Sequence, residues 1–258
     1  MTLNFPLPFL PERHTKPRNN GLTMMMDKGL SLQEAENFCS SSAQYTDLVK
    51  FGFGTSLISP NVPEKIAAYK KAGLIPYFGG TLFEAFVIRG MFDKYVEYLD
   101  KFEVAHVEVS DGTMEMDHKD KLKYIEILAK KYTVLSEVGS KLAGRIITND
   151  EWISMMKTEL KAGAWKVIAE ARESGNIGIY NKDGSANTKL IDDIEQHVDQ
   201  ADIIWEAPIK NQQVWFIQHI GHNVNLGNIA PFEVIPLETL RLGLRGDTLL
   251  SFLPKNLL

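Results

Sequence analysis

The chain has 258 residues, of which 44% are hydrophobic and 24% are charged, and its formal net charge is −5. This composition excludes an intrinsically disordered chain and supplies enough apolar side chains for a sizeable core. The acidic balance argues against general nucleic-acid binding, which needs a surplus of lysine and arginine. The single cysteine, Cys39, excludes an intramolecular disulfide framework and CxxC metal motifs.

No stretch of the sequence has the roughly 20 consecutive apolar residues that a membrane-spanning helix needs. The N-terminus lacks the basic and apolar regions of a secretory signal, so we expect a cytoplasmic protein without a membrane partner. Residues 1–20 are rich in proline and basic side chains and predict an extended lead-in to a single domain that spans residues 1–258. Such an arm is compatible with self-association into a homo-oligomer.

Eight short apolar runs alternate with longer helical patterns along the chain. The runs are residues 22–26, 48–53, 74–78, 105–109, 133–135, 165–169, 203–205 and 223–226. Their lengths suit the buried strands of a parallel sheet. Ser31 and Glu34 match a capping box, and Asn149 is placed to cap the helix that carries Trp152 and Met156, which we expect in the core.

The spacing of the runs favours a closed barrel. Their predicted carboxyl ends recur at steps of 19 to 36 residues, close to the roughly 30 residues of a βα unit. Eight such units give the size of a (β/α)8 barrel. The alternative, an open doubly wound sheet, usually has a G-x-G-x-x-G turn after its first strand. Because Asp27-Lys28-Gly29 stands there instead, we predict an α/β protein with a (β/α)8 TIM-type barrel.

Glutamates recur at the predicted ends of four consecutive strands, which in a barrel border the active site. They are Glu108, Glu137, Glu170 and Glu206. Carboxylates that are crowded in one cavity repel each other unless a cation lies among them. Oxygen ligands of this kind suit Mg²⁺. The pattern over four strands therefore predicts a Mg²⁺ site, although a single glutamate at a strand end is more often a solvated or ion-paired loop residue.

Basic side chains accompany these carboxylates on the predicted strands or in the loops that follow them. They are Lys28, Lys50, Lys141 and Arg172. A carboxylate-held metal with lysine and arginine beside it suits a small anionic substrate, because the cations hold charge while a lysine moves a proton. Gly79-Gly80-Thr81 and Gly227-Asn228 are equally compatible with phosphate-binding backbone nests and with tight turns.

Other conspicuous residues predict packing. The run Met24-Met25-Met26 is expected in the core of the first strand, and Cys39 on an amphipathic helix is expected to be inert. His106 is expected within a strand as a partly buried histidine.

Several segments, taken together and in order, resemble the phosphosulfolactate synthase family over nearly the whole chain. They include Arg13-x-x-Lys16-Pro17-Arg18, Asp27-Lys28-Gly29, Gly79-Gly80-Thr81-Leu82-Phe83-Glu84, Glu108-Val109-Ser110-Asp111-Gly112, Leu135-Ser136-Glu137-Val138-Gly139, Glu170-Ala171-Arg172 and Val224-Asn225-Leu226-Gly227-Asn228.

The resemblance implies a (β/α)8 carbon–sulfur lyase that adds sulfite to phosphoenolpyruvate and requires Mg²⁺. The product is (2R)-phospho-3-sulfolactate, which in methanogens opens coenzyme M synthesis. Mg²⁺ would stabilise an aci-carboxylate, and a general acid would protonate C2. We expect Lys141 as that acid, with Lys28 as the alternative.

Position and charge suggest the remaining roles. The expected Mg²⁺ ligands are Glu108, Glu137 and Glu170, with Glu206 beside them. The expected substrate-binding residues are Lys50, Arg172, Asn225, Gly227 and Asn228.

The sequence departs from the family pattern at three positions. Phe53 stands where the family commonly has tryptophan, Ser140 where a lysine is usual and Asn181 where an aspartate is usual. Two rival functions remain: another Mg²⁺-dependent barrel lyase or aldolase acting on a small anionic substrate, and a non-catalytic stress-associated homologue that keeps the barrel as a scaffold. The intact set of strand-end glutamates favours an enzyme.

Overall fold

A computed structural model describes residues 3–140, 147–172 and 174–258. Its strands are β1 (Thr23–Asp27), β2 (Leu48–Phe51), β3 (Ile75–Phe78), β4 (His106–Val109), β5 (Thr133–Val138), β6 (Ala164–Ala169), β7 (Ile203–Glu206) and β8 (Leu226–Ile229). Its α-helices are α1 (Leu32–Ser42), α2 (Val62–Lys71), α3 (Gly80–Val87), α4 (Phe92–Lys101), α5 (His118–Leu128), α6 (Asn149–Lys161), α7 (Thr188–Glu195), α8 (Lys210–His219) and α9 (Val234–Arg241).

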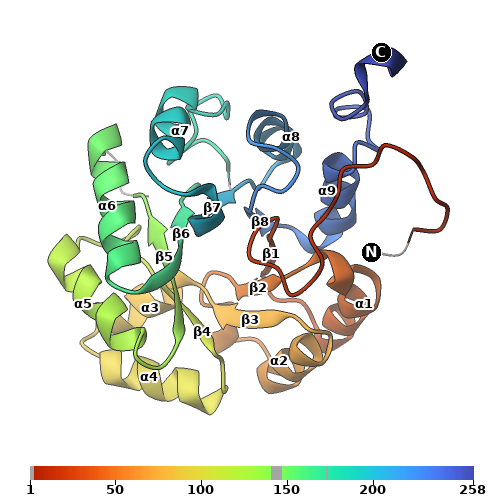
Figure 1. The fold of residues 1–258 in the computed structure, drawn as a ribbon. Helices are drawn as coiled ribbons and strands as arrows, with labels where there is room; N and C mark the ends of the chain where they lie inside the picture. Colours follow the sequence, from red (N-terminus) through yellow and green to blue (C-terminus); the bar gives the residue numbers. More distant parts are fainter. Residues whose placement is uncertain (1–2, 141–146, 173) are drawn as a thin grey trace.

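The strands lie inside a ring of helices (Figure 1). Hydrogen bonds join them in the order β3-β2-β1-β8-β7-β6-β5-β4, and every pair is parallel. The two ends of this order, β3 and β4, also lie against each other. The predicted (β/α)8 barrel is therefore confirmed. Among the described residues no backbone ladder joins β3 to β4, so that seam depends on side-chain contacts.

Alternation along each strand builds two apolar layers. Met24 points into the barrel, where it packs with Leu48, Tyr77 and Ile204, whereas its neighbour Met25 belongs to the larger layer between sheet and helices. Successive side chains of a strand point to opposite faces, so one run of three methionines serves both layers. The core roles predicted for this run and for the α6 residues Trp152 and Met156 are confirmed.

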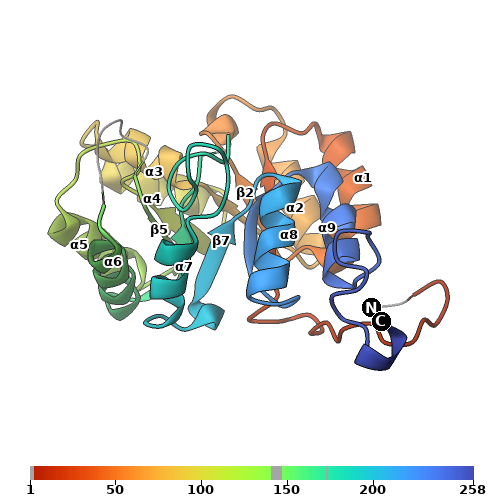
Figure 2. The same cartoon turned by 90° about the horizontal axis from the view of Figure 1, so that it is seen from above.

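The N-terminal lead-in is held against the base of the barrel by buried ion pairs. Arg13 Nε lies 2.9 Å from Glu238 Oε1 on α9, and Arg18 Nη2 lies 2.9 Å from Asp47 Oδ2, just before β2. Figure 2 shows both chain ends on one side of the barrel. Arg13 and Arg18 therefore attach the lead-in to the end of the barrel where the strands begin.

Helix boundaries follow local chemistry. Ser31 and Glu34 form the predicted capping box at the start of α1. At the start of α6 the cap is Thr148, which forms a capping box with Glu151, and Asn149 is the first helical residue. The expectation that Asn149 caps this helix is therefore wrong by one position, because the Thr148 hydroxyl is the group that accepts the Glu151 N–H.

The last strand differs from its prediction. β8 begins at Leu226 rather than at residue 223 and includes Gly227 and Asn228. The preceding residue, Asn225, joins neighbouring segments at the base through its side chain. Its Oδ1 accepts the N–H of Leu22 at 3.0 Å, and its Nδ2 donates to the carbonyl of Ile203 at 2.9 Å.

His106 is partly buried at the start of β4, and desolvation lowers its pKa to about 4. No helix among the described residues has both the length and the apolar character that crossing a bilayer requires.

Candidate active site

A buried lysine and three glutamates meet at the carboxyl end of the barrel. The Lys50 ammonium lies 2.9 Å from Glu108 Oε1, 3.1 Å from Glu137 Oε2 and 3.4 Å from Glu206 Oε1. None of these four side chains is more than 7% exposed. We call them the Lys50 cluster. The sequence predicted all four as site residues from strands far apart in the chain, and the structure brings them into direct contact.

Strand alternation explains why these polar side chains point inward. On β2, the neighbours of Lys50 are Val49 and Phe51, which pack in the layer between sheet and helices, so Lys50 faces the interior. Glu108 faces inward for the same reason, because both of its neighbours in β4 belong to the outer layer.

Backbone N–H groups hold two of the carboxylates in place. The N–H of Ala171 donates to Glu206 Oε2 at 2.7 Å, and the N–H of Gly80 donates to Glu108 Oε1. Gly80 is the first residue of α3, and a Cβ there would collide with Ser110 and come within 3.0 Å of Glu108 Oε1. This turn therefore needs a glycine. The hydrogen bond from the Gly80 N–H to Glu108 joins the end of β3 to β4.

The charges within the Lys50 cluster shift the pKa values of its members. Burial alone would lower the pKa of Lys50, but Glu108, Glu137 and Glu206 outweigh it and raise that pKa well above its ordinary value. Burial raises the pKa of Glu108, and Glu137 adds to this effect while Lys50 opposes it. Lys50 is therefore a permanent positive charge at neutral pH rather than a proton donor.

A small pocket of about 30 Å³ adjoins the cluster. Besides the cluster it is lined by Met26, Gly52, Phe53, Gly79, Gly80, Thr81, Ala171 and Asn228. Asn228 Oδ1 is buried and has no hydrogen-bond partner within the described part of the chain. Asn228 was predicted to bind substrate, and it presents a polar atom whose hydrogen-bonding capacity is unused.

The structure places two other predicted substrate-binding residues elsewhere. Asn225 lies at the base of the barrel, at the amino end of β8, which corrects the expectation that it ends a strand beside the site. Gly227 lies within β8, where a Cβ would press against Met24 and Ile204 in the barrel interior. Gly227 therefore leaves room for the Met24 and Ile204 side chains to pack.

Glu170 and Arg172 follow β6 directly. Glu170 is buried, and a Cβ on Gly112 would come within 2.8 Å of both of its carboxylate oxygens. Arg172 is half-buried next to Ala171, whose amide holds Glu206. Glu170 thus lies beside the loop after β4 and outside the pocket lining.

Of the two lysines predicted as general acids, the structure describes the position of Lys28 alone. Lys28 is exposed and lines a larger, mostly apolar groove between α1 and residues 230–235. Met26 borders both this groove and the pocket, so the two hollows adjoin. Lys141 lies outside the described residues.

Sequence reasoning missed a buried carboxylate next to the cluster. Glu84 on α3 accepts hydrogen bonds from the Ser110 hydroxyl and from the N–H of Thr113, the latter at 3.0 Å. Ser110 Oγ also lies 3.4 Å from Glu137 Oε1. A signal was available, because Glu84 is the single charged residue in the otherwise apolar α3.

Asp27, which the sequence placed at the end of the first strand, has a structural role. Its Oδ2 lies 2.6 Å from Lys65 Nζ and accepts the Tyr69 hydroxyl at 2.9 Å. Both partners are on α2, so this buried group joins the helix to the end of β1.

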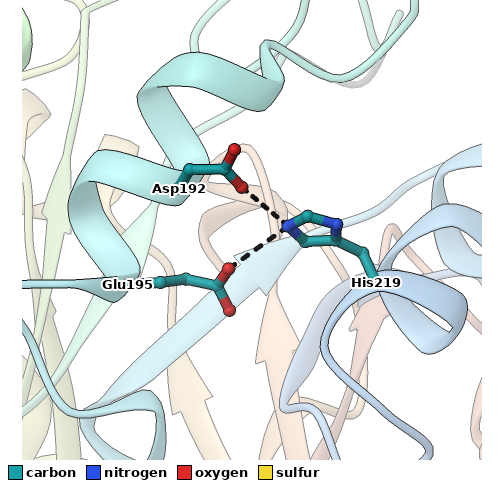
Figure 3. Close-up of side chains that lie close together, drawn as sticks. All are labelled: Asp192, Glu195 and His219. Atoms are coloured by element: carbon teal, nitrogen blue, oxygen red, sulfur yellow. Dashed lines mark hydrogen bonds and ion pairs between the residues drawn. The ribbon is translucent and has the colours of Figure 1, made fainter.

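A second charged group lies on the outer helices α7 and α8 (Figure 3). His219 Nε2 lies 2.8 Å from Asp192 Oδ1 and 3.2 Å from Glu195 Oε2. Within the described ranges, this is the one set of three histidine, cysteine, aspartate or glutamate side chains whose ligand atoms all lie within 4.8 Å of one another. The glutamates of the Lys50 cluster are arranged around an ammonium group instead.

Comparison with known proteins identifies the family. The family model for (2R)-phospho-3-sulfolactate synthase (ComA) matches residues 11–247. The chain is 43% identical over 243 residues to the phosphosulfolactate synthase of Bacillus subtilis strain 168, with 93% of this chain and 96% of that protein covered. It is 41% identical over 245 residues to the phosphosulfolactate synthase of Methanothermobacter thermautotrophicus, with 93% and 95% covered.

Solved structures show similarity of fold alone. The YdjI aldolase of Escherichia coli K12 matches with a TM-score of 0.55 at 9% identity, over 82% of this chain and 75% of that one. The 3-hexulose-6-phosphate synthase of Salmonella typhimurium matches with a TM-score of 0.52 at 12% identity, over 87% and 100%. The two phosphosulfolactate synthases match this chain in sequence over nearly their whole length. The chain therefore belongs to the (2R)-phospho-3-sulfolactate synthase family.

Proposed function

We propose that this protein adds sulfite to phosphoenolpyruvate and releases (2R)-phospho-3-sulfolactate. The observation that carries the proposal is the match to named phosphosulfolactate synthases at 41–43% identity over 93% of the chain. The sulfur atom of sulfite would attack the methylene carbon C3, and C2 would take up a proton. Both substrates are small anions, and charged side chains at the carboxyl end of a barrel, where active sites of this fold lie, suit them.

The charge balance of the pocket supports a cation there. Three glutamates surround one ammonium, so the Lys50 cluster carries excess negative charge that would repel an anionic substrate. The donor set has the chemistry that Mg²⁺ prefers, because carboxylate oxygens and the unpartnered Asn228 Oδ1 are hard oxygen ligands, but the carboxylates converge on the Lys50 ammonium, which a bound Mg²⁺ would have to displace. We propose that Glu108, Glu137 and Glu206 hold it, with Glu170 as a fourth candidate. When bound, Mg²⁺ would neutralise negative charge on substrate oxygens.

The chain's own residues would then divide the remaining work. Lys50 keeps the three glutamates converged and stays charged, so the proton for C2 must come from another group. We propose Lys141 for this role, with Lys28 as the alternative, since a positioned lysine can act as a general acid. Arg172 and the Asn228 amide are proposed contacts for the phosphate or sulfonate oxygens.

The test is a product assay on the purified chain. The protein is incubated with phosphoenolpyruvate, sulfite and Mg²⁺, and phosphosulfolactate is sought by mass spectrometry. We expect product that depends on both substrates and that carries the label when ³⁴S-sulfite is supplied. Unlabelled or absent product at enzyme concentrations that bind phosphoenolpyruvate would reject the proposed reaction.

A further inference from the structure

A lysine outside the pocket joins the segments that carry the site. Lys121 on α5 is fully buried. Its ammonium donates to the backbone carbonyl of Glu137 at 2.6 Å and lies 2.9 Å from both Asp111 Oδ1 and Glu159 Oε1. One hydrogen bond and two ion pairs thus surround this ammonium. The acceptors belong to the loop after β4, to β5 and to α6.

Two of these acceptors lie directly next to active-site groups. Glu137 belongs to the Lys50 cluster, and Lys121 fixes the carbonyl of that same residue. Asp111 stands between Ser110, whose hydroxyl lies 3.4 Å from Glu137 Oε1, and Gly112, whose backbone packs against the Glu170 carboxylate. One buried cation therefore sets the relative positions of the β4 loop and the end of β5.

The third acceptor extends the same network to the next helix. Glu159 Oε1 faces Lys121, and its other oxygen accepts the Ser136 hydroxyl at 2.6 Å. Ser136 immediately precedes Glu137 on β5. The Ser136 side chain and the Glu137 carbonyl are thus held from outside the barrel, by α6 and by α5.

A buried charge at this position is costly, and an apolar side chain would fill a helix–sheet contact at lower cost. The lysine is therefore poorly explained by packing alone. Active-site groups need placement to within about 0.5 Å, and one hydrogen bond and two buried ion pairs at the strand end supply such placement.

We propose that Lys121 is a positioning residue, which holds Glu137 and the loop after β4 in the arrangement that the reaction requires. The proposal rests on the proposed function for its kinetic readout, but its structural readout is independent of the reaction. Lys121 touches no substrate and exchanges no proton in this scheme.

The experiment compares Lys121→Met with Arg13→Met. Both changes remove a buried cation from a carboxylate, but the Arg13–Glu238 pair lies at the opposite end of the barrel. Both variants should melt at lower temperature than the wild type. Measured per folded molecule, we expect Lys121→Met to lose at least 10-fold in kcat with the KM for phosphoenolpyruvate changed less than threefold. Arg13→Met should keep kcat within twofold.

Crystal structures of both variants supply the second readout. The Lys50 Nζ–Glu137 Oε2 distance, 3.1 Å in the intact protein, should lengthen by about 0.5 Å or more in Lys121→Met and should not change in Arg13→Met. If Lys121→Met fails to fold, Glu159→Gln, which weakens the same network, should give a smaller loss confined to kcat. An unaltered kcat together with an unaltered Lys50–Glu137 distance in the folded variant overturns the proposal.

The two proposals fail in different ways. A wild-type protein that forms no phosphosulfolactate rejects the reaction, and the Lys50–Glu137 distance then decides the role of Lys121. A wild-type protein that turns over, with Lys121→Met equally active and Glu137 unmoved, rejects the positioning role alone.

Discussion

Lys50 on β2 and Glu137 on β5 are 87 residues apart in the sequence, and their side chains meet at 3.1 Å. On one side, the strands between them are β3 and β4, the two that no backbone ladder joins among the described residues. The contacts of Lys50 with Glu108 and of Glu108 with the Gly80 amide cross this same seam. Site residues therefore also close the barrel at its carboxyl end.

The first prediction concerns the carboxylate of Glu137. Glu137→Gln keeps the side-chain volume but removes a negative charge from the Lys50 cluster and from the proposed Mg²⁺ site. We expect the rate of phosphosulfolactate formation to fall by about 100-fold or more, since losing even a residue that only supports a metal ligand costs about 10- to 100-fold. The measurement is kcat/KM under saturating Mg²⁺.

The matched control is Glu64→Gln, the same chemical change at an exposed position on α2. It should leave kcat/KM within about twofold of the wild type. Equal activity in the two variants would mean that the strand-end glutamates do not form the reacting site.

The second prediction is metal dependence. The buried pocket gathers three carboxylates around a single ammonium, so a divalent cation should be needed before an anionic substrate can bind. Treatment with EDTA followed by its removal should abolish turnover, and added Mg²⁺ should restore it. Full turnover by protein that elemental analysis finds free of divalent metal would contradict the proposed site.

The third prediction concerns stability. Lys50→Met leaves Glu108, Glu137 and Glu206 without their shared cation in a buried pocket. Removing one partner of a buried ion pair costs about 3–5 kcal/mol, and we expect a loss of that order in the free energy of unfolding at pH 7, measured by urea denaturation. Lys94→Met, which breaks an exposed ion pair on α4, should change the free energy by less than about 1 kcal/mol.

The pH dependence of this loss has a definite sign. Burial already raises the pKa of Glu108, and removal of Lys50 would raise it further. A carboxyl whose pKa is higher in the folded state binds more protons there than when unfolded, so the variant gains stability as pH falls. The difference between wild type and Lys50→Met should therefore be larger at pH 7 than at pH 5. A difference that grows on acidification would contradict this account of the cluster.

Much of this arrangement followed from the sequence because it depends on local rules. The lengths and spacing of the apolar runs predicted the barrel, and the glutamates at successive strand ends predicted Glu108, Glu137 and Glu206 as neighbours. The eighth strand was misplaced because Gly227-Asn228 was interpreted as a turn or a phosphate-binding nest after the strand, whereas both residues lie within β8.

The sequence predicted which charged residues belong to the site, but it did not predict which of them pair with each other. The sequence predicted Lys50 as a substrate-binding residue, and the structure shows its ammonium among three carboxylates. Strand alternation shows which side chains point inward, but it does not show how they pair. Lys121 and Glu84 were missed for a related reason: both are on helices, and their roles depend on how each helix packs against the strand ends.

The last prediction identifies the proton donor. The addition of sulfite leaves C2 needing a proton on one face only, and Lys50 is too firmly held in its charged form to supply it. Lys141 follows Glu137 by four residues in the sequence. Lys141→Ala should therefore lose about 100- to 10,000-fold in kcat, the range for a positioned general acid. Phosphoenolpyruvate should still bind, because the proposed Mg²⁺ site and Arg172 remain.

Lys28→Ala is measured beside it, since Lys28 lines the adjoining groove rather than the pocket. We expect this variant to keep most of its kcat. A collapse of kcat in Lys28→Ala with near-normal turnover in Lys141→Ala would transfer the acid role to Lys28 and would require the substrate to extend past Met26 into that groove. Near-normal kcat in both variants would exclude both lysines as the donor.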